Sequence, residues 1–267
     1  MSKKVQTFDP RQQMRRRNYE IFYYREPRGA QVAVHHHDFY EIYCFMGEVA
    51  EYWVDGLTYT LRAGDLLLIN PMALHRPILR GGGAYERYVL WIDPAYLDSL
   101  SPDGSLSRCF QDHTHLIGGQ VSETLSRLVE ECYSQDFGAP LCADGIFLQL
   151  MVEINRLAGK KRAKRESPAL ISGVLAYIGE NFSSEISLDG LASRFFVNKY
   201  YLSHEFKRET GTSIYRFIKL KRLAAARRML LEGVPPGEVA LACGFSEYTA
   251  FFKAFREEYG VPPSRIR

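Results

Sequence analysis

The closing stretch of this chain, residues 244–265 (GFSEYTAFFKAFREEYGVPPSR), most constrains what the sequence can fold into. It opens with a glycine suited to a left-handed turn, continues with a serine suited to capping a helix, and ends in a double proline that stops a helix. Residues 197–211 (VNKYYLSHEFKRETG) repeat the order of a cap, an aromatic and basic helix, and a glycine. Two such helices in tandem predict a protein that contacts DNA at two places.

Size and composition exclude several classes of protein. The chain of 267 residues is long enough for two domains, each with its own core. It has no apolar run of about 18 residues, and its first residues lack the apolar core of a signal peptide. We therefore expect a cytoplasmic protein with no membrane partner. The five cysteines form no CxxC pair, which suits a reducing compartment and argues against a disulfide or zinc-finger scaffold.

The net charge of +3 is unevenly distributed along the chain. Residues 1–159 hold 15 basic and 20 acidic side chains, whereas residues 160–167 hold 5 and 1, and residues 168–267 hold 14 and 10. An acidic front and a basic rear indicate that only the rear meets a polyanion.

The front part of the chain has the pattern of a β-domain. Residues 1–18 are polar and rich in arginine, which predicts a flexible arm, and residues 19–159 form the predicted front domain. Up to about residue 92, short runs rich in Tyr, Val, Ile and Trp alternate with turn signals, including an Asp-Gly hairpin pair. That spacing predicts an antiparallel barrel or sandwich.

The rest of the front domain is predicted to be irregular and then helical. Residues 93–119 show no regular pattern, whereas residues 121–134 and 145–159 have helical periodicity. These two helices either close the barrel core or form the surface of a homodimer. Residues 160–167 are charged and poor in apolar side chains, and they are the expected linker.

Residues 168–267 predict an all-helical domain with two helix-turn-helix units, the first at about residues 187–208. Ser187 and Asn198 are its predicted helix caps. The inward stripe of its second helix is predicted to be Tyr201, Leu202 and Phe206. The outer side then combines lysines suited to phosphates with groups that can contact base edges: Lys199, Tyr200, Ser203, His204 and Lys207.

The second unit is predicted at about residues 235–258. A double proline starts its first helix, Gly244 makes the turn and Ser246 caps the second helix. Ala250, Phe251, Ala254 and Phe255 are the predicted inward residues. The outer side carries Tyr248, Thr249, Phe252, Lys253 and Arg256, together with Glu247.

A basic helix of about 19 residues joins the two units and would be ~28 Å long. That length approaches the ~34 Å between successive major-groove faces on one side of B-DNA. A basic helix taken alone is usually a solvated surface. The paired arrangement, however, favours two recognition helices in adjacent major grooves. The helix carries Arg216, Lys219, Lys221, Arg222, Arg227 and Arg228 near the expected phosphates.

The whole of residues 168–267 resembles the DNA-binding domain of the AraC/XylS family of bacterial transcription regulators. The resemblance rests on ISLDGLASRFFVNKYYLSHEFKRETG and, most specifically, on EVALACGFSEYTAFFKAFREEYGVPPSRIR. It implies base contacts from Tyr200, Ser203, His204, Tyr248, Thr249 and Lys253. Asn198 stands where serine is usual and Ile266 where an aromatic residue is common.

The front domain carries a second group of chemically active residues, in VHHHDFYEIY and GDLLLINPMALH. In an extended strand His35, His37 and Glu41 lie on one side, and His75 from a later strand could complete a divalent-metal site. His36 points to the other side. The pattern resembles a cupin barrel, the kind of sensor that AraC-type regulators often carry, and the cupin metal ligands map to the same four residues. The resemblance implies that residues 19–159 are an effector-sensing and dimerisation domain.

Three roles for this group stay open: metal binding, contact with a small polar effector, and structural pairing. Tyr43 and Trp53, with other aromatics of the barrel, could stack on a sugar or phenolic ring.

The predicted fold is α+β with two domains, a cupin-like β-barrel with two flanking helices and an all-α domain with two helix-turn-helix units. The chain is predicted to be a sequence-specific transcriptional regulator, and by family resemblance an activator. It is expected to be controlled by a small-molecule effector, such as a sugar, bound in the barrel. It requires no cofactor, catalyses no reaction, and has double-stranded DNA, a second copy and RNA polymerase as expected partners. The alternative is a metal-dependent cupin enzyme fused to a DNA-binding domain.

Overall fold

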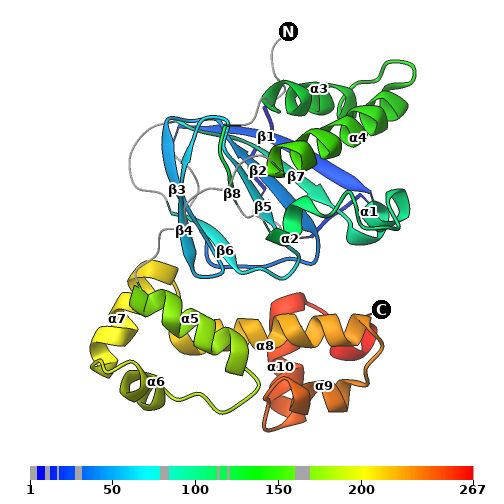
Figure 1. Ribbon diagram of the computed structural model, residues 1–267. Coiled ribbons are helices and arrows are strands. Elements are labelled where there is room, and N and C mark those ends of the chain that lie inside the picture. The colour runs from blue at the N-terminus through cyan, green and yellow to red at the C-terminus, as the bar shows by residue number, and fades with distance from the viewer. Residues whose placement is uncertain are drawn as a thin grey trace. The chain divides into compact units, whose positions relative to one another are not determined.

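The computed structural model describes residues 5–9, 13–16, 18–27, 32–78, 84–112, 115–118, 121–159 and 169–266. The chain divides into two compact units, one essentially before residue 167 and one after it, and each is described by itself. The first unit is rich in strands and the second is helical (Figure 1), which confirms the predicted α+β class. The predicted linker, residues 160–167, lies outside the described residues.

Two antiparallel sheets form the barrel of the first unit. Asp55 and Gly56 both have positive φ between two strands of the smaller sheet, which confirms the predicted hairpin turn. The larger sheet has the order β1 (Tyr19–Glu26), β7 (Tyr85–Ile92), β2 (Tyr40–Phe45), β5 (Leu66–Ile69) and β8 (His115–Leu116). The smaller sheet has the order β4 (Leu57–Arg62), β3 (Val49–Val54) and β6 (His75–Ile78).

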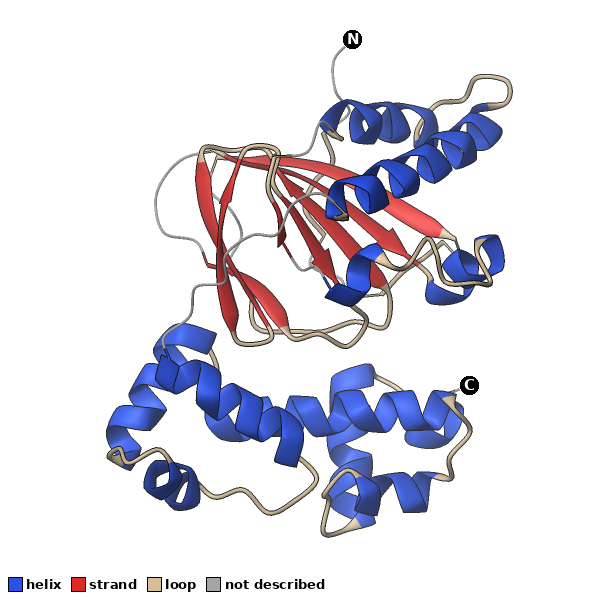
Figure 2. Cartoon of the chain, viewed as in Figure 1, coloured by secondary structure: helices blue, strands red, loops and turns tan. Residues whose placement is uncertain are grey.

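The period-two alternation of the strands creates two cores. On β1, Ile21 and Tyr23 pack with helices α3 (Ser122–Cys132) and α4 (Ala139–Ala158), which cover one side of the larger sheet (Figure 2). The intervening Phe22 and Tyr24 belong to a second cluster, rich in aromatic residues, that occupies the barrel interior; we call it the inner cluster. The two predicted helices therefore do close a core.

Several boundaries differ from the predictions. The stretch 93–119 is not wholly irregular: it contains α1 (Pro94–Leu100), α2 (Cys109–Asp112) and β8, because elements this short carry no readable period. Helix α4 begins six residues before the predicted start, where Gly138 has a left-handed φ of 76° and a proline occupies the first turn. Residues 5–9, predicted as part of a flexible arm, contact β1: the Gln6 amide donates to the Tyr23 carbonyl at 2.9 Å.

The second unit consists of helices joined by short turns. They are α5 (Ala169–Asn181), α6 (Leu188–Arg194), α7 (Lys199–Thr210), α8 (Ile214–Leu231), α9 (Pro236–Ala242), α10 (Tyr248–Tyr259) and a 3₁₀ turn η1 (Pro263–Arg265). Within the part of the chain that is described, none of the helices combines the length and apolar character needed to cross a bilayer.

One tight backbone contact joins the two halves of this unit. Gly244, in the turn before α10, has a φ of 81°, and a Cβ added there would lie 2.5 Å from the carbonyl oxygen of Ser183. On either side of Ser183, the carbonyls of Phe182 and Ser184 accept hydrogen bonds from the Arg222 guanidinium on α8, at 2.7 and 2.8 Å. The loop that leads into the first helix-turn-helix is thereby held against the turn of the second.

We predict that Gly244→Ala destabilises the helical unit far more than Gly260→Ala. Both glycines are left-handed, so both alanines incur a strain of about 1–2 kcal/mol, but nothing lies within 4 Å of a Cβ at Gly260. At Gly244 the added methyl group meets a backbone carbonyl that cannot rotate away. Both tryptophans of the chain, Trp53 and Trp91, lie in the barrel. Urea unfolding is followed by circular dichroism at 222 nm, which is weighted toward the second unit because that unit holds most of the described helical residues. Tryptophan fluorescence reports the barrel alone and serves as an internal control. Equal losses of stability in the two variants would contradict the contact.

Candidate functional site

The first helix-turn-helix consists of α6, a short turn and α7. The Ser187 hydroxyl accepts a hydrogen bond from the Gly190 amide at 3.0 Å, and the Asn198 side chain accepts one from the Tyr200 amide at 2.8 Å. These contacts confirm both predicted caps. Leu202 and Phe206 are buried one turn apart, which fixes the side of α7 that faces the core.

The opposite side of α7 presents most of its predicted residues to solvent. The side chains of Tyr200, His204 and Lys207 are exposed, whereas Ser203 and Lys199 are only partly so. Lys199 also forms an ion pair with Asp189 of α6 at 2.8 Å.

Two turn-proximal aromatics differ from the predictions for this unit. Tyr201 was expected to point inward but is 52% exposed, because it lies ~100° around the helix from Leu202. Phe196 was not predicted as part of the surface, yet in the turn before α7 it is 95% exposed with a φ of 55°. A positive φ at a phenylalanine has no signal in the sequence.

The second helix-turn-helix consists of α9, the Gly244 turn and α10. Phe251 and Phe255 are fully buried as predicted, but Ala250 is exposed. The helix begins at Tyr248 with Glu247 at its cap position and no side-chain capping bond, so the prediction that Ser246 caps it is wrong. The chain is still extended at Glu247, which starts the helix one residue later.

The outer side of α10 has a mixed chemistry. Tyr248, Thr249, Lys253 and Arg256 are exposed. Phe252 is half-buried, with its ring 6.3 Å from that of Tyr248. The side therefore offers two cations, a hydroxyl and an aromatic ring, which suits contact with phosphates and base edges.

Helix α8 connects the two units over 18 residues and is therefore ~27 Å long. Several basic side chains of α8 make contacts within this unit. Arg222 holds the loop carbonyls described above, Lys219 pairs with Glu257 of α10 at 3.3 Å, and Arg228 lies 3.9 Å from Glu232. The helix thus fixes the positions of its neighbours as well as supplying charge.

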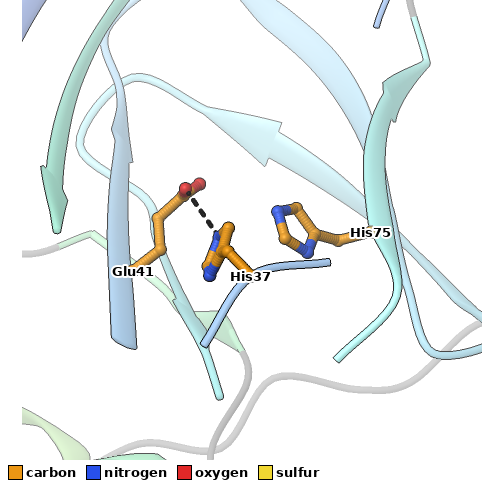
Figure 3. Close-up of side chains that lie close together, drawn as sticks. All are labelled: His37, Glu41 and His75. Atoms are coloured by element: carbon orange, nitrogen blue, oxygen red, sulfur yellow. Dashed lines mark hydrogen bonds and ion pairs between the residues drawn. The ribbon is translucent and has the colours of Figure 1, made fainter. Parts of the chain in front are cut away.

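A buried polar cluster lies inside the barrel, formed by His37, Glu41 and His75; we call it the His-Glu-His cluster. One potential ligand atom from each residue lies within 4.8 Å of the others, and all three residues are buried. His37 Nε2 is 3.2 Å from Glu41 Oε2. Figure 3 shows the His75 ring facing the other two side chains.

Neighbouring groups orient each member of the cluster. Nδ1 of His37 lies 2.9 Å from the Phe39 carbonyl, and Nδ1 of His75 lies 2.8 Å from the Ala73 carbonyl. A carbonyl can only accept a hydrogen bond, so Nδ1 carries the proton in both rings. Trp91 Nε1 donates to Glu41 Oε2 at 2.9 Å, and these two residues are direct partners across β2 and β7.

His35, the fourth predicted metal ligand, does not join this cluster. Its Nδ1 lies 2.9 Å from the Ala33 carbonyl, and the residue is only partly buried. The prediction assumed a continuous strand through residues 35–41, but β2 begins at Tyr40. The period-two rule therefore does not relate His35 to His37.

The two aromatics predicted for the effector pocket divide between the sides of their strands. Tyr43 belongs to the inner cluster and its hydroxyl hydrogen-bonds that of Tyr85. Trp53, although buried, alternates with Tyr52 along β3 and is not part of the inner cluster, so its predicted place in the pocket is wrong. Trp91 takes part instead, through its bond to Glu41.

Burial shapes the ionisation of the inner tyrosines. Burial, followed by the nearby Glu41 carboxylate, raises the pKa of Tyr52 well above its usual value. Burial and the neighbouring Tyr85 raise the pKa of Tyr43, and burial raises the pKa of Tyr85 to about 12. The interior thus holds neutral hydroxyls that can donate and accept hydrogen bonds at physiological pH.

Comparisons with known proteins cover both units. Residues 18–151 match the family model of the AraC-like ligand binding domain, and residues 191–267 match that of a helix-turn-helix domain. The chain is 26% identical over 261 residues to the HTH-type transcriptional activator RhaS of Escherichia fergusonii, which covers 91% of this chain and 90% of that protein. The same activator of Salmonella schwarzengrund is 27% identical with the same coverage. Among solved structures, ToxT from Vibrio cholerae aligns with 93% of this chain and 97% of its own, at a TM-score of 0.41 and 12% identity.

The ligand-binding family model alone spans half of the chain, and the helix-turn-helix model spans the part that contains α7 and α10. The relatives are transcriptional activators matched along nearly their whole length. The chain therefore belongs to the AraC family of DNA-binding transcriptional regulators, with an AraC-like ligand-binding domain in front and a helix-turn-helix domain behind.

Proposed function

We propose that this regulator activates transcription by placing α7 and α10 in two adjacent major grooves of one promoter site, under the control of an effector held in the barrel. The observation that carries the proposal is the fixed geometry of the helical unit. The length of α8, ~27 Å, is close to the ~34 Å of one turn of B-DNA. The Arg222 bonds and the Gly244 contact keep the two helix-turn-helix units from moving independently of each other.

The exposed residues divide into two roles by their chemistry. Near the start of each recognition helix, Tyr200 and Thr249 offer groups suited to base edges, joined by His204 and Lys253 one turn further on. Lys207 and Arg256, toward the ends of the helices, are suited to phosphates and to the salt-sensitive part of binding.

We predict that Lys253→Ala weakens binding to a cognate duplex by about 10-fold, in line with the ~1–3 kcal/mol of one specific contact. The duplex is selected by the wild-type protein from random sequences, and affinity is measured by fluorescence anisotropy at fixed salt. His204→Ala added to Lys253→Ala weakens binding further because it acts in the other groove. Arg25→Ala is the matched control, since it removes one exposed positive charge from the barrel. Unchanged affinity in the double variant would rule out these recognition surfaces.

The proposed effector is a small polyhydroxyl compound of the sugar class. Sugars are bound by aromatic rings together with hydroxyl and carboxylate groups, and the barrel interior carries both kinds. The rings of Tyr43 and Tyr52 lie 4.8 Å apart, and Glu41, His37 and His75 supply the polar side.

We predict that one member of a panel of monosaccharides raises the melting temperature of the barrel, followed by tryptophan fluorescence, and tightens DNA binding. A ligand at 100 times its Kd adds about 2.7 kcal/mol of stability. Tyr52→Phe reduces the shift because it removes a hydroxyl from the interior. Tyr96→Phe, on the helix-covered side of the sheet, leaves it unchanged. If sugars leave both stability and DNA affinity unaltered, the sugar class is wrong.

The proposed assembly is a homodimer formed by antiparallel pairing of α4. One side of α4 packs on the barrel, while a second stripe of Leu141, Gly145, Leu148 and Val152 is exposed. The steps of four, three and four residues are those of a helix-pairing seam. Gly145 costs helix stability of about 1 kcal/mol, yet it allows a second backbone to approach closely. When this apolar stripe packs against the same stripe of a second copy about a two-fold axis, the exposed apolar side chains of both helices are buried together.

We predict that the wild-type protein sediments as a dimer at micromolar concentration and that Leu148→Glu yields monomers. The substituted carboxylate would be buried against its symmetry mate, which is strongly unfavourable. Val49→Glu, at an apolar position of β3 that is 57% exposed, is the control and stays dimeric. A wild-type monomer, or a dimer that tolerates Leu148→Glu, would contradict the α4 interface.

The proposal includes RNA polymerase as the partner of an activator, a cytoplasmic location, and no catalytic role for either unit. The enzyme alternative would draw on the His-Glu-His cluster alone. Turnover of a sugar or a phenol by the purified protein would favour it.

A further inference from the structure

The turn of the first helix-turn-helix holds an exposed phenylalanine in an unusual backbone conformation. Phe196 has a φ of 55° and is 95% exposed. We propose that Phe196 contacts DNA beside α7, by packing on the 5-methyl group of a thymine in the promoter site. This inference rests on the proposed placement of α7 in a major groove, and it adds a contact from outside both recognition helices.

The conformation of Phe196 is unfavourable for a residue with a side chain. A positive φ crowds Cβ against the backbone, whereas glycine adopts it freely. Among the described residues other than glycine, Asp55 and Met72 also have positive φ. The Asp55 carboxylate accepts a hydrogen bond from the Leu74 amide at 3.1 Å, and the Met72 amide donates to the His37 carbonyl at 2.7 Å. Phe196 instead has an exposed ring, so packing of its side chain does not offset the strain. Strain at such a residue indicates a function outside the folded unit.

The residues around Phe196 hold the turn in place. Phe195 packs inward on α5, where its ring atom Cε1 lies 3.0 Å from the position that a Cβ on Gly173 would occupy. Across the turn, the ion pair of Lys199 with Asp189 at 2.8 Å links α7 to α6. The backbone of Phe196 is therefore ordered before DNA binds, which lowers the entropy cost of a contact.

Phe196 lies next to the surface that meets DNA. It is two residues before Asn198, the cap of α7, so the two Cα atoms are at most about 7.6 Å apart. Recognition helices enter the major groove by their N-terminal residues. The turn that leads into α7 therefore lies at the edge of the groove, close to Tyr200, which is 75% exposed. Because the chain belongs to a family of DNA-binding regulators, DNA is the partner within reach of the Phe196 ring.

The phenyl ring restricts the kind of contact that Phe196 can make. It carries no charge and no hydrogen-bonding group, so it is not suited to phosphate oxygens or to the polar edges of bases. The apolar group that B-DNA displays in the major groove is the 5-methyl group of thymine, and phenylalanine is one of the side chains that contact it. We therefore expect a thymine in the part of the promoter site that the first helix-turn-helix binds.

The test replaces single thymines by deoxyuridine, which lacks only the methyl group. The duplex is the one that the wild-type protein selects from random sequences, and affinity is measured by fluorescence anisotropy at fixed salt. We expect one thymine in the tract bound by α7 at which the replacement weakens wild-type binding by about 4-fold, the effect of one buried methyl group. Phe196→Gly binds the thymine duplex more weakly than the wild type by at least that factor, and it does not distinguish thymine from uracil at this position.

Two controls separate this contact from general effects on binding. Uracil placed in the tract bound by α10 affects the wild type and Phe196→Gly equally. Phe137→Gly, which removes an exposed phenylalanine from the barrel unit, keeps the wild-type preference for thymine.

A stability measurement separates loss of the contact from loss of the fold. The urea midpoint of Phe196→Gly, followed by circular dichroism at 222 nm, does not fall below that of the wild type, because the strain removed exceeds the flexibility that glycine adds to the unfolded chain. Phe196→Asn, which adopts a positive φ without that flexibility, also loses the preference for thymine. A lower midpoint in both variants would show that the ring stabilises the unit, against the proposal.

Two binding results would overturn the proposal. One is a wild-type protein that binds the thymine and uracil duplexes equally at every position of the tract bound by α7. The other is a Phe196→Gly variant that keeps the full preference for thymine. If that variant also fails to activate transcription by RNA polymerase from the selected site, the ring contacts a protein instead of DNA. Each of these results leaves the effects of Lys253→Ala and His204→Ala on DNA binding intact, so this inference and the proposed function can fail separately.

Discussion

The Arg222 guanidinium and the Gly244 turn together determine the geometry of the DNA-binding unit. Arg222 donates to the carbonyls of Phe182 and Ser184, and the backbone between them fits against a glycine that has no room for a side chain. Neither contact touches the recognition surfaces. Both nevertheless determine where α7 and α10 lie relative to each other, because they join the loop before the first helix-turn-helix to the turn of the second helix-turn-helix. The affinity of such a protein for one site depends on that distance being constant.

Local signals in the sequence were sufficient to predict the helical unit. Ser187 and Asn198 cap their helices through hydrogen bonds to residues two or three positions along the chain. A few neighbouring residues were therefore enough to predict their roles. The partners of Arg222 lie about 40 residues away and have no such signal. Ser246 failed as a cap because one residue of extended chain separates it from the helix, a difference that no local preference decides.

The sequence was sufficient to predict that the front domain is a β-barrel, but not how its strands pair or which side of each strand faces the interior. Both sides of the larger sheet are apolar, since Ile21 and Tyr23 meet helices while Phe22 and Tyr24 line the interior. Alternation of polar and apolar residues therefore cannot indicate which side faces inward. The smaller sheet has the same ambiguity, since Tyr52, Trp53 and Val54 are all buried along β3, and Trp53 was therefore predicted to line the pocket although it is not part of the inner cluster. The grouping of His35 with His37 failed for another reason, because the segment between them is not a strand. The pairing of Glu41 with Trp91 depends on strand register and was not predictable.

In the proposed complex, one protomer contacts DNA through two recognition helices held about one helical turn apart. Methylation interference on the selected duplex tests it most directly, because it maps major-groove contacts base by base. We expect, for each bound protomer, two short tracts of interference centred about 10 base pairs apart on one side of the duplex. A single tract per protomer, or two tracts on opposite sides of the duplex, would contradict it.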